Sequence, residues 1–182
     1  MSDNLKIITW PDPRLLKVSE KVTDFNGALR DLAQRMFHLM REARGVGLAA
    51  PQVGVNIRMF VMNHSGRPED DRVIVNPVLS DPEGEEEAEE GCLSLPSINI
   101  QVRRIRTVTL RAQDMDGKPL EFRASGYVAR IWQHEIDHLD GILLTERMGV
   151  LDRMKARKTL KQLREEYEAA HGRTGSKGLL RR

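Results

Sequence analysis

The chain has 182 residues, and 40% of them are hydrophobic. This length is sufficient for one hydrophobic core and short for two. We therefore expect a single domain over residues 1–170 and a flexible basic tail over residues 171–182. A formal net charge of +2 argues neither for nor against nucleic-acid binding, but four Phe, two Tyr and two Trp leave little aromatic material for base stacking, so we expect no sequence-specific nucleic-acid binding. We find no apolar run long enough to span a bilayer and no signal peptide at the start, so we expect a cytoplasmic protein with no membrane partner. A single cysteine excludes an internal disulfide.

Residues Asn26–Arg44 carry apolar side chains at helical spacing, which predicts the first helix. The next segment, Gly45–Gln52, superficially matches the dinucleotide-binding fingerprint GxGxxA. That fingerprint must follow a strand and open a helix, whereas this segment follows a helix and carries Pro51 where a new helix would need backbone donors. We therefore interpret Gly45 as the C-terminal cap of the helix, and the glycines as places where backbone can approach a ligand closely.

Four later segments alternate apolar and polar residues or are rich in Val and Ile, as strands are. They are residues 57–63, 72–79, 106–114 and 120–124. Between the second and third of them, Asp81–Glu90 holds seven acidic residues and no basic one. This run predicts a solvated loop or edge that leads into a short turn around Cys92, which is flanked by Gly91 and Pro96.

Residues Gly126–Leu139 are expected to form a second helix, and this segment contains the pattern HExxH. Residues four apart on a helix lie on one face within about 6 Å of each other. His134 and His138 can therefore hold one metal ion, while Glu135 points at a water on that metal. This geometry is typical of a metal-dependent hydrolase.

The residues alone leave the third metal ligand open. Cys92 would supply a thiolate and leave one position free for water, as catalytic sites do. A glutamate from a following helix, such as Glu165, would instead give a zinc endopeptidase. Cys92 can also be interpreted as an inert buried thiol, or as a nucleophile; the nucleophile is disfavoured because His134 and His138 come with Glu135 at metal spacing.

The C-terminal region combines an amphipathic pattern with positive charge. Residues 149–170 predict a terminal helix, with apolar positions on one face at Leu151, Met154, Leu160, Leu163 and Tyr167. Residues 151–182 contain ten Lys or Arg against four Asp or Glu. Such a basic face is either simply solvated or a surface for RNA.

Three segments, in this order, resemble the motifs of the peptide deformylase family: GxGLAAxQ, EGCLS and HExDH. Here they are Gly45–Gln52, Glu90–Ser94 and His134–His138, and they match at every defined position. The resemblance covers roughly residues 5–150. It implies an α+β fold, with mostly antiparallel β-sheets wrapped around a central HExxH metal-binding helix and with a C-terminal helix. The implied activity is removal of the formyl group from the N-formylmethionine of nascent proteins, with release of formate.

The resemblance also implies a role for each residue of the metal site. Cys92, His134 and His138 become the ligands of one metal ion, and Glu135 becomes the general acid and base that activates a water on it. The implied metal is Fe(2+), one per chain, for which Zn, Ni or Co can substitute. The amide of Gln52 and the backbone N–H of the residue after the cysteine are the implied donors to the developing oxyanion; in this chain that residue is Leu93.

Substrate binding requires a small space for the formyl group and an apolar slot for the methionine side chain. The residues that we expect around them are Gly45, Val46, Gly47, Tyr127 and Ile131. Tyr127 and Ile131 lie on the same helical face as His134, although apolar residues at this spacing often simply belong to the core. Arg130 stands where some members of the family carry an apolar residue, which leaves the lining of this pocket open.

The implied partners are N-formylmethionyl nascent peptides. The resemblance further implies, for the basic C-terminal helix, a contact with the ribosome where new chains emerge. A catalytically silent relative that only binds the ribosome is the remaining alternative, since the presence of ligands does not by itself establish turnover.

Overall fold

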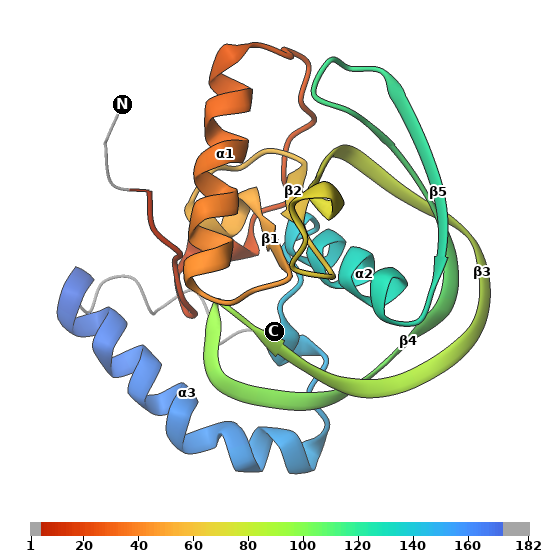
Figure 1. The fold of residues 1–182 in the computed structure, drawn as a ribbon. Coiled ribbons are helices and arrows are strands. Elements are labelled where there is room, and N and C mark those ends of the chain that lie inside the picture. The colour runs from red at the N-terminus through yellow and green to blue at the C-terminus, as the bar shows by residue number, and fades with distance from the viewer. Residues whose placement is uncertain (1–4, 173–182) are drawn as a thin grey trace.

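The computed structural model describes residues 5–172, which form a curved antiparallel sheet with three helices (Figure 1). In chain order the elements are α1 (Gly27–Glu42), β1 (Gly47–Ala49), β2 (Met59–Met62), β3 (Arg72–Cys92), β4 (Leu95–Gln113), β5 (Pro119–Ser125), α2 (Tyr127–Leu139) and α3 (Val150–His171). None of the described helices has the length and apolar character that crossing a membrane would require.

The five strands form one antiparallel sheet in the order β1-β2-β3-β4-β5. β3 and β4 form a long hairpin whose register shifts at three places, between Val75 and Val78, between Ser80 and Glu83, and between Gly91 and Cys92. Because such irregularities bend a strand and increase its twist, the hairpin curls around α2 rather than lying flat. This confirms the expected α+β class with an antiparallel sheet wrapped around the HExxH helix.

α2 lies inside the curled sheet, and its apolar side packs on the strands (Figure 1). Ala129, Trp132 and Leu139 belong to one core cluster with Phe60 and Leu110. All five side chains are at most 4% exposed. Full burial of this many large side chains fixes the position of the helix, because protein interiors are close-packed and tolerate little displacement.

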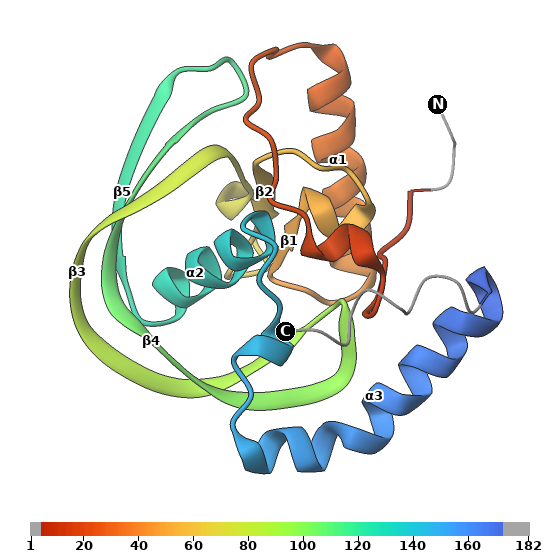
Figure 2. The ribbon, with the colours of Figure 1, turned by 180° about the vertical axis from the view of Figure 1, so that it is seen from behind.

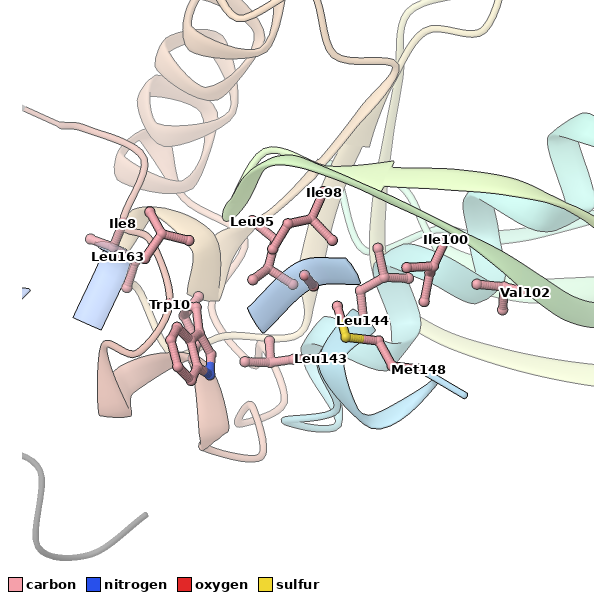
Figure 3. Packing of buried hydrophobic residues seen from close by; sticks show 12 residues of the cluster. Ile8, Trp10, Leu95, Ile98, Ile100, Val102, Leu143, Leu144, Met148 and Leu163 are labelled. Carbon is pink, nitrogen blue, oxygen red and sulfur yellow. The ribbon is translucent and has the colours of Figure 1, made fainter. Parts of the chain in front are cut away.

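A second cluster connects α3 and the N-terminal segment to the first half of β4 (Figure 3). Ile98, Ile100 and Val102 alternate along β4 and belong to this cluster, together with Trp10 and Leu163. The view from behind shows α3 outside the hairpin, on the side away from α2 (Figure 2). α3 is therefore held by the outer cluster and not by the helix that carries HExxH.

The apolar face predicted for the C-terminal helix is wrong in part. α3 spans Val150–His171, close to the expected residues 149–170, but Leu151 and Met154 are 71% and 69% exposed. Of the other predicted positions, Leu163 is buried and Leu160 is partly buried against the outer cluster; Ala156, which was not predicted, is buried as well. The sheet touches only part of α3, so the apolar residues of its first turn point into solvent. Of the tail predicted over residues 171–182, residues 173–182 lie outside the described part.

Asp81–Glu90 was expected to be a solvated loop or edge; the whole run belongs to β3, and no described strand pairs with its side opposite β4, so the edge is correct and the loop is wrong. Its side chains are exposed, apart from the intermediate Ala88 and the buried Glu90. The charges are compatible with a strand because arginines of β4, and of β5 beyond it, pair with some of them: Arg103 of β4 lies 3.7 Å from Glu85, and Arg123 of β5 lies 2.6 Å from Glu83. Cross-strand pairs of opposite charge stabilise a sheet that the run alone does not indicate.

Candidate metal centre and active site

α2 and the end of β3 bring the three predicted metal ligands together. His134 and His138 lie one turn apart on α2, with their ring centroids 5.1 Å apart. Cys92 is the last residue of β3, and its Sγ lies 3.2 Å from Nε2 of His138. One ligand atom from each of the three residues lies within 4.8 Å of the other two. Ligands of a tetrahedral metal are spaced at about 3.4 Å, given metal–ligand distances near 2.1 Å, so the cluster suits a single ion.

The charge of the cluster also suits a metal cation. Burial works to raise the pKa of the Cys92 thiol, but the charges and hydrogen bonds of His138 and His134 outweigh it and lower the pKa to about 5. Thiolate, not thiol, is the form that binds metals. One thiolate and two imidazoles are ligands for zinc-like or iron-like ions, and three protein ligands leave a coordination position open. The residues present therefore fit a catalytic metal.

Glu90 orients one of the two imidazoles. Its Oε2 lies 3.0 Å from Nδ1 of His134, and because an ionised carboxylate only accepts, Nδ1 carries the proton and leaves Nε2 for a metal. Burial works to raise the pKa of Glu90, but the hydrogen bonds from Arg104 and His134 prevail and hold it well below its usual range. Glu90 stands in the EGCLS motif, yet its orienting role was not predicted, because sequence gives no sign that this one acid of the run is buried.

Glu135 lies beside the cluster without a partner for one of its oxygens. The residue is 4% exposed, and its Oε2 has no hydrogen bond among the described residues. Burial raises the pKa of the Glu135 carboxyl to about 7, against the lowering effect of His134 and His138. A carboxyl with a pKa near neutrality can both take and return a proton at physiological pH, as a general acid and base must.

Gln52 holds a fixed amide against the cluster. It is 1% exposed, its Oε1 accepts a hydrogen bond from the backbone N–H of Ala49 at 2.8 Å, and its Nε2 donates to Oγ of Ser94 at 3.1 Å. The same Nε2 lies 3.7 Å from Sγ of Cys92. Leu93 follows Cys92 in the turn between β3 and β4. The two predicted oxyanion donors therefore lie next to the predicted metal ligand.

The segment after α1 forms the opposite wall of the site. α1 ends in a Schellman motif, in which the N–H of Gly45 bonds to the carbonyl of Met40 at 2.8 Å. The left-handed residue of the motif is Arg44, with φ 55°, so the prediction that Gly45 itself caps the helix needs correction. Gly45 serves packing instead, since a Cβ there would lie 2.7 Å from Cδ1 of Leu93.

A cavity of about 600 Å³ opens between these walls. Its lining includes each residue predicted to bind substrate, namely Gly45, Val46, Gly47, Tyr127 and Ile131. Cys92, His134 and Glu135 also line it. Ile131 is buried, whereas Tyr127 is 56% exposed. The structure thus brings the predicted binding and catalytic residues to one cavity, with Tyr127 at its solvent-exposed side.

A curled sheet around an HExxH helix, with one thiolate and an unpartnered carboxylate facing a cavity, defines a hydrolase of the single-metal class.

The polypeptide deformylase family model matches residues 4–154. A peptide deformylase of Acidobacterium capsulatum is 46% identical over 149 residues, covering 81% of this chain and 88% of that protein. A solved peptide deformylase of Plasmodium falciparum has a TM-score of 0.88 at 36% identity, covering 91% of this chain and 99% of that one. A solved peptide deformylase of Legionella pneumophila has a TM-score of 0.84 at 43% identity, covering 89% of this chain and 96% of that one. The chain belongs to the polypeptide deformylase family.

Membership makes the chain a hydrolase of a metal-dependent family, and it leaves the zinc endopeptidase alternative without support. The geometry agrees. Glu165, the third ligand of that alternative, lies on α3 and pairs with Lys161 at 3.7 Å. Among residues 5–172, the cluster of possible metal ligands consists of Cys92, His134 and His138 alone.

Gly47 offers a direct test of the geometry around Glu135. A Cβ at this position would lie 2.2 Å from Oε1 of Glu135, so the carboxylate would have to leave its place beside the metal ligands. Gly47→Ala should therefore displace Glu135 and lower kcat for deformylation by about 10²-fold, with metal content unchanged. Gly27→Ala is the matched control, because a Cβ there meets nothing within 4 Å. Wild-type turnover by Gly47→Ala would show that Glu135 need not keep this position.

Proposed function

We propose that this chain hydrolyses the N-formyl group of N-formylmethionyl peptides, releasing formate and a free amino terminus. The observation that carries the proposal is the placement of Glu135, a buried carboxyl with one unpartnered oxygen, beside the cluster of Cys92, His134 and His138. Proton transfer at neutral pH and attack on a carbonyl both need this combination.

Cys92, His134 and His138 would hold one divalent metal ion, which supplies Lewis-acid activation of water and of the formyl carbonyl when bound. Glu135 takes the proton of the attacking water as its oxygen bonds to the formyl carbon, and gives that proton to the nitrogen as the C–N bond breaks. The Nε2 of Gln52 and the N–H of Leu93 donate to the oxygen that becomes negative in between. The products are formate and the free amine.

An extended peptide can reach this site along the edge of β3. β3 pairs with β2 only through its first residues, Arg72–Val75, and with β4 along its other edge. After Val75, no described strand pairs with the edge of β3 that faces away from β4. Glu89–Cys92, near the end of this free edge, line the cavity. A peptide that adds itself to a strand edge gains main-chain hydrogen bonds while its side chains enter pockets. In this arrangement Val46, Tyr127 and Ile131 form the slot for methionine.

Replacement of Glu135 tests the assigned role most directly. Glu135→Gln keeps the shape of the side chain but cannot accept the proton, so formate release from a short N-formylmethionyl peptide should fall by about 10²- to 10⁴-fold. Metal content should stay that of the wild type, because Glu135 is not a proposed ligand. Glu165→Gln is the matched control and should retain full activity. The unformylated peptide should stay intact with every variant, and its internal cleavage or undiminished formate release by Glu135→Gln would contradict the proposal.

We propose Fe(2+) as the physiological metal, in line with the family resemblance and with a donor set that includes one soft thiolate. Zn, Ni or Co would bind the same three ligands. A thiolate beside ferrous iron is readily oxidised, so the iron-loaded enzyme should lose activity in air and keep it under nitrogen, while the zinc-loaded enzyme should be indifferent. Equal half-lives of the iron form with and without oxygen would contradict this assignment.

We further propose that α3 contacts the ribosome in the cytoplasm, a compartment that keeps thiols such as that of Cys92 reduced. Arg157 and Lys158 are exposed on α3, in a helix that also exposes Leu151 and Met154. Contacts of this kind to RNA phosphates weaken steeply with salt.

The charge-reversal variant Arg157→Glu/Lys158→Glu leaves the buried side of α3 untouched and should abolish co-sedimentation with ribosomes at low salt, without affecting peptide turnover. The matched control Lys17→Glu/Lys21→Glu reverses two exposed cations outside α3 and should co-sediment like the wild type. Equal co-sedimentation of both variants with the wild type would refute the contact.

A further inference from the structure

Arg130 is a buried arginine one helical turn before His134. It belongs to α2 and is 7% exposed. Arginine is almost never fully buried unless its charge is paired. Here the partner is Glu90, whose Oε1 accepts a hydrogen bond from Nη1 of Arg130 at 2.7 Å. This is the same carboxylate that orients His134, so Arg130 and His134 meet at one group.

The carboxylate of Glu90 is saturated with donors. Oε1 accepts from Nε of Arg104 at 2.9 Å and from Arg130, and Oε2 accepts from Nη2 of Arg104 at 2.9 Å and from Nδ1 of His134 at 3.0 Å. A carboxylate offers about four lone-pair sites, so all of them are used. The group has no freedom to rotate without losing a charge-assisted hydrogen bond.

Arg130 also binds the backbone of both long strands. Nη1 donates to the carbonyl of Val102 on β4 at 2.8 Å, and Nη2 donates to the carbonyl of Glu86 on β3 at 2.8 Å. The guanidinium group of Arg130 therefore connects α2, β3 and β4 beside the metal ligands. The planar fork of arginine suits three such acceptors, whereas lysine is a single point charge on a flexible chain.

Arg104 cannot take over this function alone. Its Nη1 donates to Oδ2 of Asp137 at 2.5 Å, so its charge is shared between the buried carboxylate of Glu90 and the partly buried one of Asp137. Without Arg130, Oε1 of Glu90 would lose one of its two donors, and the carbonyls of Glu86 and Val102 would lose theirs. The carboxylate could then turn away from His134.

We propose that Arg130 is a positioning residue for the metal: it fixes the carboxylate of Glu90, which in turn holds His134 with Nε2 directed at the ion. The inference rests on the proposed metal site of the deformylase. Arg130 lines the substrate cavity, but its guanidinium group is committed to Glu90 and the two carbonyls. It acts on the reaction through His134 and not through the peptide.

The test measures the affinity of metal-free protein for Zn(II), by competition with a chromophoric chelator. Arg130→Met should weaken zinc binding by about 10- to 100-fold, the usual effect of losing a group that orients a ligand. Arg58→Met is the matched control: Arg58 pairs with Asp140 at the end of α2, its side chain is 17% exposed, and it has no contact with Glu90 among the described residues. Its zinc affinity should stay within about twofold of the wild type.

Two further measurements separate positioning from a merely structural role. Glu90→Gln should weaken zinc binding as Arg130→Met does, and the double variant should lose little more than either, because both act through His134. The increase in Tm on metal binding should also be smaller for Arg130→Met than for the wild type. Additive losses, or a lower Tm of the metal-free protein with unchanged zinc affinity, would overturn the proposal.

Arg130→Lys keeps the inference testable if Arg130→Met does not fold. Lysine can reach Glu90 with one donor only, so an affinity between those of the wild type and Glu90→Gln is expected, and wild-type affinity would overturn the proposal. Zinc binding is independent of formate release. A wild type that binds zinc but releases no formate contradicts the deformylase function and leaves the role of Arg130 standing, whereas normal zinc affinity in the Arg130 variants contradicts that role alone.

Discussion

The helix that carries the metal ligands is buried, so each polar atom on it needs a partner from the sheet that surrounds it. β3 supplies Cys92 and Glu90, and β4 supplies Arg104. Among the described residues, two buried polar atoms of α2 remain without partners, Oε2 of Glu135 and Nδ1 of His138. An unpaired buried polar group costs about 1–3 kcal/mol. The fold tolerates this cost at the cavity, where a free carboxylate oxygen is what hydrolysis requires.

One row of alternate residues on β4 serves both the packing of α3 and the chemistry of the metal site. Ile98, Ile100, Val102 and Arg104 alternate along the strand, and all four are buried. The first three fill the cluster that holds α3, whereas Arg104 meets Glu90 and Asp137. Because alternate residues of a strand share one face, a single row of side chains provides both the apolar contact and the cation that the metal helix needs.

Helical spacing predicted the local part of the site, the family resemblance added the distant Cys92 and Gln52, and the ionic contacts around Glu90 were missed. The spacing of His134 and His138 follows from helical periodicity, so it could be read directly. Glu90 lies 14 residues from Arg104 and 40 from Arg130 in sequence, and only the curl of the hairpin around α2 brings them together. The acidic run lacks the apolar alternation by which strands are recognised, so the full length of β3 was missed as well.

The ionic network is better understood as a device of orientation than of stability. A buried ion pair gains little net free energy, because desolvation of both charges offsets their attraction, but removal of one partner is costly. Asp137 accepts from Arg104 on one side and from Arg147 on the other, at 2.5 and 2.6 Å. Arg147 lies just before α3 begins. The contacts that hold His134 in place therefore continue, through two carboxylates and two arginines, to the residues just before the C-terminal helix.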